Sequence, residues 1–270
     1  MFRKFIRTTI YSVIALGMLL PSLISCQSSY VQIKKKPIVH SSLPYKSFAR
    51  IGVSKKVEAE SCISKTEKMN VECESLIKKL PVVEFNSIGS GTLVKHNSKF
   101  FILTAAHVCE METPEKTDYK GFSFKLRHVK TEISVMLWAG LKFKAKEFIV
   151  QEKNDLCAIP VSGGQILPKP VVLAKKPPMI GDKVINIASP HGITGPYMNL
   201  VFDGRYAGVN RGFSYYTIPA RPGSSGSAIL NENYEVVGTV SIAFNGFENV
   251  GIGNGLKEIR EFLDQITDTK

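Results

Sequence analysis

Three short motifs carry side chains that together could perform acyl transfer. His107 lies in "LTAAHVC", Asp155 in "NDLCAI" and Ser225 in "PGSSGSA". A serine hydroxyl attacks a carbonyl when a base removes its proton, and an acid can hold that base in the required tautomer. These groups must meet in space, not in sequence. The motifs therefore suggest Ser225 as nucleophile, His107 as base and Asp155 as orienting acid, although an ordinary turn would also use glycine and serine around position 225.

The candidate residues also fit ordinary structural roles. An aspartate immediately before an apolar strand, as at Asp155, is usually a cap or turn residue. A histidine in an apolar setting is usually a core residue, so His107 depends on its partners. The other four histidines lie in tether, turn, basic and loop segments, where surface roles are expected: His40, His96, His128 and His191.

The glycines around Ser225 favour a special backbone conformation. Gly223 and Gly226 permit strained dihedral angles, which would bring the N–H groups of Gly223 and Ser225 toward one point. Two such donors form an oxyanion hole for acyl transfer. The sequence has no HxxxH or CxxC spacing, so no metal and no organic cofactor is expected.

The segments that must position these residues have the pattern of many short strands. From residue 82 onward, apolar runs of strand length alternate with turn signals, and no long helices separate them. This pattern favours antiparallel barrels or a sandwich, an all-β fold, over a parallel sheet. One helix is expected at the end, in "GLKEIREFLDQI", where four apolar residues share a face: Leu256, Ile259, Leu263 and Ile266.

At the three motifs the sequence resembles the trypsin-like serine peptidases. "TAAHV", "NDLCAI" and "PGSSGSAI" are similar to the histidine, aspartate and nucleophile motifs of that family, in the same order, with spacings of 48 (155 minus 107) and 70 (225 minus 155). The resemblance implies two antiparallel six-stranded β-barrels with a C-terminal helix and the active site between the barrels. It also implies a serine endopeptidase with His107, Asp155 and Ser225 as the triad, acting on protein or peptide substrates.

Further segments are similar to the bacterial HtrA/Deg protease domain. They are "GSGTLV" before the histidine motif, "GDKVINIASPHG", and "NENYEVVGTVSIAF", which resembles the strand alongside which substrate lies. The resemblance extends from about Phe48 to the terminal helix, and because the remainder is short, no PDZ domain is expected. A catalytically silent protease-like domain that binds a partner at the cell envelope is the alternative, and a purely structural lipoprotein is a third reading.

The resemblance also places the pocket for the residue before the scissile bond. It implies that the segments before the nucleophile and after Thr239 bind substrate, with five candidates: Ile218, Pro219, Val240, Ser241 and Ile242. Because this set contains no acid, a small or medium apolar residue is the expected guest. Arg221 would select an acidic residue instead if it points inward.

The first residues have the pattern of an export signal. Arg3, Lys4 and Arg7 precede the apolar run "TIYSVIALGMLL", and "LISC" follows. "LISC" resembles the lipobox of bacterial lipoproteins, which implies a lipid on Cys26, whereas a plain secretory signal or an uncleaved anchor are the alternatives. We expect a signal over 1–25, a tether over 26–45 and a peptidase domain over 46–270, exported and anchored to a membrane facing the periplasm or the exterior.

Four cysteines remain besides Cys26: Cys62, Cys73, Cys109 and Cys157. An even number in an exported protein suggests two disulfides, with Cys62–Cys73 as the obvious local pair. Cys109 and Cys157 are equally well explained as buried free thiols. Each follows a proposed catalytic residue by two positions, however, so the contact of His107 with Asp155 would make a Cys109–Cys157 bridge feasible.

The charge of the chain does not indicate nucleic-acid binding. The formal net charge of +12 falls to +9 when the three positive charges of residues 1–25 are removed. The remaining basic residues are scattered, apart from "KKK" at 34–36, and lack the interleaved aromatic residues of a nucleic-acid groove. A soluble basic surface with some affinity for anionic lipid is expected.

Overall fold

The computed structural model describes residues 42–63, 73–161, 167–243, 246–247 and 249–268. The chain divides into two units, Met1–His40 and Ser41–Lys270, and all described residues belong to the second. The expected signal, Cys26, most of the tether and His40 therefore lie outside the described residues. Within the described ranges, no helix is both long and apolar enough to span a membrane.

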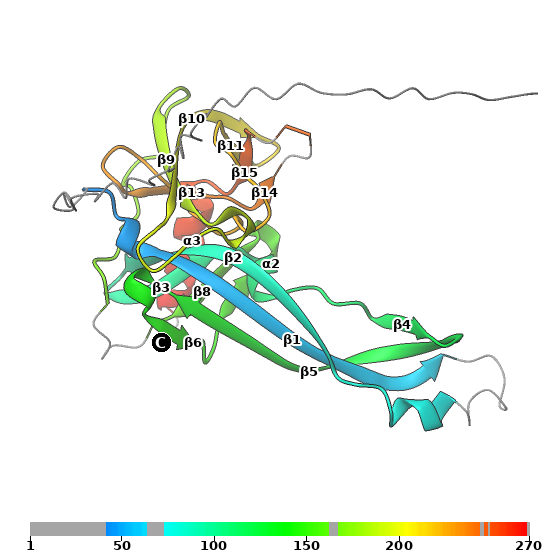
Figure 1. Cartoon of the computed structure of the whole chain (residues 1–270). Helices are drawn as coiled ribbons and strands as arrows, with labels where there is room; N and C mark the ends of the chain where they lie inside the picture. The colour runs from blue at the N-terminus through cyan, green and yellow to red at the C-terminus, as the bar shows by residue number, and fades with distance from the viewer. Residues whose placement is uncertain (1–41, 64–72, 162–166, 244–245, 248, 269–270) are drawn as a thin grey trace, which may run out of the picture. The chain divides into compact units, whose positions relative to one another are not determined.

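The first sheet has eight antiparallel strands (Figure 1). Their bounds are β1 Phe48–Ile63, β2 Val83–His96, β3 Lys99–Thr104, β4 Lys116–Tyr119, β5 Phe122–Met136, β6 Lys142–Lys144, β7 Ile149–Gln151 and β8 Leu156–Pro160. The order is β4-β5-β1-β2-β3-β8-β7, and β6 pairs with β5. A single helical turn, α2 (Ala106–Cys109), follows β3 and carries His107.

The second sheet has seven antiparallel strands, in the order β13-β12-β9-β10-β11-β15-β14. Their bounds are β9 Lys183–Ala188, β10 Leu200–Asn210, β11 Phe213–Tyr216, β12 Ala228–Leu230, β13 Val236–Thr239, β14 Ile242–Ala243 and β15 Gly251–Gly253. The described residues also form the 3₁₀ turns η1 Tyr45–Ser47, η2 Trp138–Gly140, η3 Glu152–Asn154 and η4 Pro190–Gly192, and the terminal helix α3, Leu256–Asp268. The all-β, double-barrel prediction is confirmed, with sheets of eight and seven strands where six each were expected.

The extra strands build an extension that we call the arm, residues 55–63, 73–85 and 116–130 (Figure 1). The sequence predicts a helical or looped insertion between Lys55 and Leu80, but β1 continues to Ile63, and of the described residues in this span only 73–77 are helical. The distal part of β1 pairs with β5, about 70 residues away, and Val57 is buried there. Local patterns cannot reveal such a distant partner.

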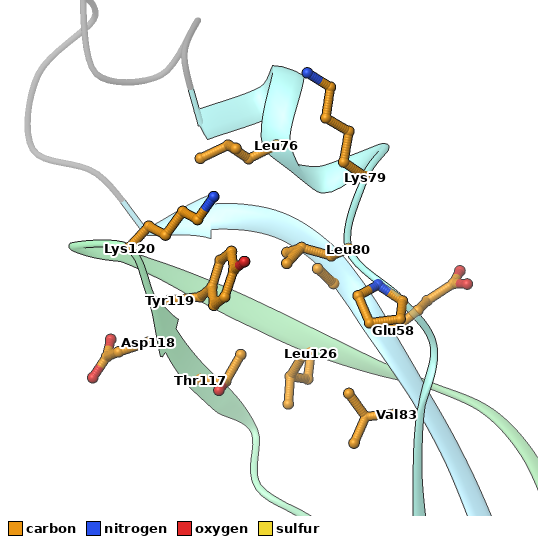
Figure 2. A pocket seen from close by; sticks show the side chains of 12 residues that line it. Glu58, Leu76, Lys79, Leu80, Val83, Thr117, Asp118, Tyr119, Lys120 and Leu126 are labelled. Carbon is orange, nitrogen blue, oxygen red and sulfur yellow. The ribbon is translucent and has the colours of Figure 1, made fainter.

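The arm has its own small apolar pocket of about 330 Å³ (Figure 2). Leu76, Leu80 and Tyr119 surround it between the helical residues and the strands. The Cys62–Cys73 disulfide, expected from the sequence, joins the end of β1 to the start of those helical residues.

The largest core cluster joins both sheets to α3. Its buried residues come from the first sheet, the second sheet and the helix, among them Phe48, Phe101, Leu156, Ile185, Leu230, Val236, Ile259, Phe262 and Leu263. The predicted apolar face of the helix is confirmed, since Leu256, Ile259 and Leu263 are buried and Ile266 packs against the cluster. Phe262 is an additional core residue that the predicted face omitted. The helix therefore holds the two sheets together on the side of their shared core.

Cys109 and Cys157 form the second disulfide, with their Cα atoms 6.5 Å apart. It joins α2 to β8, so the free-thiol alternative does not hold. Disulfides persist in oxidising compartments such as the periplasm and the cell exterior. The bridge also fixes the turn that bears His107 to the strand that follows Asp155.

Replacing Phe262 by alanine should lower the free energy of unfolding by about 3–5 kcal/mol, because it opens a cavity where α3 meets both sheets. Urea denaturation followed by circular dichroism measures this change. Lys257→Ala, on the solvent side of the same helix with its side chain 79% exposed, should change the free energy by less than about 0.5 kcal/mol. Similar losses for both variants would contradict the proposed role of the helix.

Candidate active site

His107 reaches the surface from a turn that is otherwise buried. In α2, Ala106, Val108 and Cys109 are buried, whereas the His107 side chain is 48% exposed. Val108 packs directly over Gly89 of β2, where a Cβ would lie 2.5 Å from Val108 Cγ1. The close approach of backbone and side chain at this point requires glycine and fixes the turn against the sheet.

Asp155 lies two residues before Cys157 and contacts His107, which lies two residues before Cys109. It caps η3 with a left-handed backbone, φ +48°, and its carboxylate accepts the His107 backbone N–H at 3.0 Å. His107 Nδ1 lies 2.9 Å from each oxygen of that carboxylate. The structure thus brings together the histidine and aspartate that lie 48 residues apart, in the geometry of a base held by an acid.

The pKa of Asp155 reflects opposing effects. Burial raises it, but hydrogen bonds from the His107 side chain and backbone, the charge of His107 and a hydrogen bond from the Ser241 hydroxyl together outweigh burial, so the pKa lies below its usual value. At neutral pH the group is a carboxylate, the form that can accept the Nδ1–H of a neutral imidazole.

Ser225 lies in a tight loop with two glycines in the left-handed region. Gly223 has φ +95° and Gly226 has φ +85°. At Gly226 a Cβ would lie 2.1 Å from Thr104 Oγ1 and 2.3 Å from the Ser90 carbonyl oxygen, so no other residue fits. The glycines that the sequence marked are therefore required both by conformation and by space.

The backbone of this loop leaves two amides for a ligand. The N–H groups of Ser224, Gly226 and Ser227 donate to protein carbonyls at 2.7 to 3.1 Å. In the part of the chain that the structure describes, the N–H groups of Gly223 and Ser225 have no acceptor. These are the two donors that the sequence predicts for an oxyanion.

The hydroxyl of Ser225 has a long hydrogen bond to the backbone of the second sheet. It donates to the Ser241 carbonyl at 3.4 Å, and the described residues contain no hydrogen bond between Ser225 and His107. Ser241 nevertheless contacts both ends of the site, because its own hydroxyl bonds to Asp155. Ser225 and Asp155 are therefore linked through a single residue.

Ser90 of β2 holds the Ser225 loop against the first sheet. Its N–H donates to the Ser225 carbonyl at 2.8 Å, and its hydroxyl donates to the Gly223 carbonyl at 2.7 Å while accepting the Ser189 N–H at 3.0 Å. Its carbonyl accepts the Thr104 hydroxyl at 2.7 Å. The sequence analysis gave Ser90 no role, although it stands in the "GSGTLV" motif.

Residues 89–238, more than half of the chain and a range that includes His107, Asp155 and Ser225, match the family described as "Trypsin-like peptidase domain". The chain belongs to the trypsin-like peptidase family. No curated protein matches the sequence. Among solved structures, the serine endoprotease from Yersinia pestis superposes with a TM-score of 0.54 at 19% identity, over 84% of this chain and 65% of that one. At this identity the likeness shows the fold, and this chain spans 65% of the length of that protein.

Asn254 is a further site residue of this trypsin-like domain that sequence analysis missed. It is buried just before α3, and its side-chain amide donates to the Asn154 carbonyl and, at 3.4 Å, to the Ser241 hydroxyl. It thereby joins the backbone next to Asp155 to the second sheet. An asparagine between glycines, as in "GIGNGL", reads as a turn, so no local signal indicates this role.

The predicted specificity residues of the trypsin-like domain separate into two groups. Ile218 and Val240 are fully buried in the core of the second sheet, and their substrate-binding role stays a prediction. Ser241 is also buried, Pro219 is half-buried, and the Ile242 side chain is 47% exposed.

The other described histidines lie outside the site or at its border. His96 contacts Asp264 at 2.6 Å, and His128 bonds to Thr131 on the arm. His191 has a left-handed backbone, and its N–H donates to the Pro222 carbonyl at 2.7 Å, which ties η4 to the Ser225 loop.

The lowered pKa of Asp155 should appear in the pH dependence of stability. A carboxyl whose pKa is depressed by folding stabilises the native state above its unfolded pKa of about 3.9, and this contribution is lost as the pH falls through the folded pKa. The loss of unfolding free energy caused by Asp155→Asn should therefore be largest near neutral pH and shrink as the pH falls through the lowered pKa of folded Asp155.

Urea denaturation from pH 7 to pH 2.5 measures this difference. Asp203→Asn is the matched control, because the Asp203 side chain is 68% exposed and has only a weak ion pair with Lys183 at 3.7 Å. A loss for Asp155→Asn that stays constant with pH would show that the carboxylate charge is not what His107 and Ser241 stabilise.

Proposed function

We propose that the chain is a serine endopeptidase with Ser225 as nucleophile, His107 as base and Asp155 as the acid that orients His107. The observation that carries the proposal is the contact of His107 Nδ1 with both Asp155 oxygens at 2.9 Å, beside a serine flanked by two amides without acceptors. Family membership and the bond of Ser241 to both Ser225 and Asp155 support it.

The mechanism begins with a rotation of the Ser225 side chain. Its long bond to the Ser241 carbonyl is weak, so little is lost when the hydroxyl turns to His107 Nε2. His107 then accepts the hydroxyl proton as Ser225 Oγ attacks the peptide carbonyl, and the N–H groups of Gly223 and Ser225 stabilise the oxyanion. His107 returns the proton to the leaving amine, and water hydrolyses the acyl-enzyme by the same steps in reverse.

The substrate residues before the scissile bond pair with the segment after Val240. Ser241 and Ile242 adjoin Ser225, and an extended peptide can bond to their backbone as an added strand. The exposed Ile242 and the half-buried Pro219 then offer apolar contact, so a small or medium apolar residue precedes the cleaved bond. Protein and peptide substrates follow from this arrangement.

A protease-like domain that binds a partner without cleaving it is the second candidate. The observation that favours it is that the Ser225 hydroxyl donates to the Ser241 carbonyl, with no hydrogen bond to His107 among the described residues. The two candidates differ in the reactivity of Ser225, which a covalent probe measures directly.

A fluorophosphonate probe should label the purified protein, and Ser225→Ala should abolish the labelling. His107→Ala should slow labelling by roughly 1,000-fold or more, because the serine then lacks its base. In-gel fluorescence over a time course measures the rates.

Ser123→Ala and His128→Ala are matched controls, because both residues lie on the arm away from the site. They should label like the wild type. A wild type that stays unlabelled while its circular dichroism is native would favour the binding domain over the enzyme.

We further propose that the peptidase domain, residues 46–270, is exported and held at a membrane by a lipid on Cys26, after removal of residues 1–25 and with residues 26–45 as tether. The two disulfides support the exported location, since they persist in oxidising compartments. The motif "LISC" after an apolar run supports the lipid.

Expression of the full chain in a bacterium should place it in the membrane fraction, and Cys26→Ser should release it or leave its signal uncleaved. Detergent phase partition and the intact mass of the mature protein measure the lipid directly. Ser25→Ala is the control, because it alters the neighbouring residue and keeps the thiol. A mature mass without added acyl chains would contradict lipidation and leave the proposed peptidase activity untouched.

A further inference from the structure

Strand β2 has neighbours on both sides along only part of its length. β1 pairs with β2 from Val83 to Thr92, whereas β3 pairs with it only from Thr92 to His96. In the described ranges, no strand lies beside residues 83–91 on the edge opposite β1. This open edge runs from the Ser225 loop into the arm.

The orientation of Ser90 shows which backbone groups face that edge. Its N–H and C=O bond to the Ser225 loop and to Thr104, so both groups point away from β1. Backbone groups alternate along a strand, and the register of β1 with β2 has no irregularity, so every second residue before Ser90 points the same way. These residues are Glu84, Asn86 and Ile88.

All three residues are exposed, and their edge-facing peptide groups have no hydrogen-bond partner in the part of the chain that the structure describes. An open row of peptide N–H and C=O groups is the template to which an extended polypeptide adds as a strand. The edge also adjoins the scissile bond, because Ser225 contacts Ser241 on one side and Ser90 on the other. A substrate that enters along Ser241 and Ile242 therefore leaves along β2.

A polar hollow of about 290 Å³ lies on the sheet face beside this edge. The register places Gly52 between Ile88 of β2 and Ser134 of β5, and Gly52 leaves the floor of the hollow without a side chain. Arg50, Asn86, Glu132 and Lys144 also line the hollow.

Arg50 extends from the hollow toward the Ser225 loop. Its Nη2 lies 3.9 Å from the position of a Cβ on Gly192, and that position is 3.1 Å from Ile88 Cδ1. The guanidinium therefore lies between the β2 edge and η4, which itself bonds to Pro222. Arg50 Nε is buried and has no hydrogen-bond partner among the described residues.

The acidic residue of the hollow does not neutralise Arg50. Glu132 is held by Lys130 and Lys144, which keep its pKa at about 2. Among the described residues, no carboxylate forms an ion pair with Arg50. A planar guanidinium that faces an open polar hollow is suited to a carboxylate.

On the proposed function, the polypeptide segment that follows the scissile bond lies along the open edge of β2 as an antiparallel strand. We propose that Arg50 binds an acidic side chain of this segment. The inference rests on the proposed function for the position of the scissile bond. Antiparallel pairing follows because β2 runs toward Ser225, and the departing segment runs away from it.

Binding to the inactive full-chain variant Ser225→Ala tests the docking without requiring catalysis. Two fluorescent peptides extend about eight residues past the cleavage site, enough to reach Glu84 at about 3.3 Å per residue, and differ only by Glu or Gln in that part. Fluorescence anisotropy should show roughly fivefold tighter binding of the Glu peptide. Arg50→Gln should abolish this preference, and Arg50→Lys should keep part of it.

Arg211→Gln is the matched control, because Arg211 is an exposed arginine in the turn between β10 and β11. It should keep the full preference for the Glu peptide. A preference that survives Arg50→Gln in a folded variant would overturn the role of Arg50.

N-methylation of the peptide tests the added strand and leaves the protein unchanged. Methylating alternate amides after the cleavage site should weaken binding by roughly tenfold in one alternate set and little in the other, because only one set faces β2. Equal effects in both sets would overturn the docking, as would a dimer in sedimentation that the peptide does not dissociate. Probe labelling of the wild type reports on catalysis separately, so the two proposals can fail independently.

Discussion

The contact of Ser90 with the Ser225 loop is the constraint on which the site depends. Every polar group of Ser90 forms a hydrogen bond. Its N–H donates to the loop, its hydroxyl donates to the loop and accepts from Ser189, and its carbonyl accepts from Thr104. Gly226 packs so closely on the Ser90 carbonyl that a single added carbon would collide with it. The hydrogen bonds of Ser90 fix the direction of the loop, and the absence of a side chain at Gly226 fixes its distance from β2. The loop therefore has one position relative to the sheet that bears His107.

A second connection between the sheets lies on the other side of the nucleophile. Ser241 bonds to Ser225 and to Asp155, and Asn254 bonds to Ser241 and to the backbone before Asp155. Asn254 precedes α3, whose apolar face packs on both sheets. The helix thus supplies apolar burial, which has no direction, while Ser90 and Asn254 supply directed polar contacts that turn a packed interface into a defined geometry.

The sequence predicted what short segments determine and missed what distant segments determine together. The motifs around His107, Asp155 and Ser225 combine a strand end or a glycine turn with a reactive group, so a few residues reveal both the local backbone and the chemistry. Ser90 and Asn254 act on partners more than 90 residues away, and as a serine and an asparagine among glycines they look like turn residues. Burial of Ile218 and Val240 depends on which face of the second sheet is covered, and the arm depends on the pairing of β1 with β5.

The route of β2 couples the arm to the nucleophile. Where a neighbouring strand would bond to Ser90, the Ser225 carbonyl occupies the N–H, so the loop continues the ladder for one residue and then leaves the edge open. Ser225 thus bonds to the sheet through its carbonyl and carries the N–H that would face an oxyanion. Because a peptide unit is planar, the Ser90 bond that orients the Ser225 carbonyl also orients the Gly226 N–H of the same unit, which donates to the Val240 carbonyl. A polypeptide that lies along the open edge therefore meets the nucleophile at a backbone already held in place by the same strand.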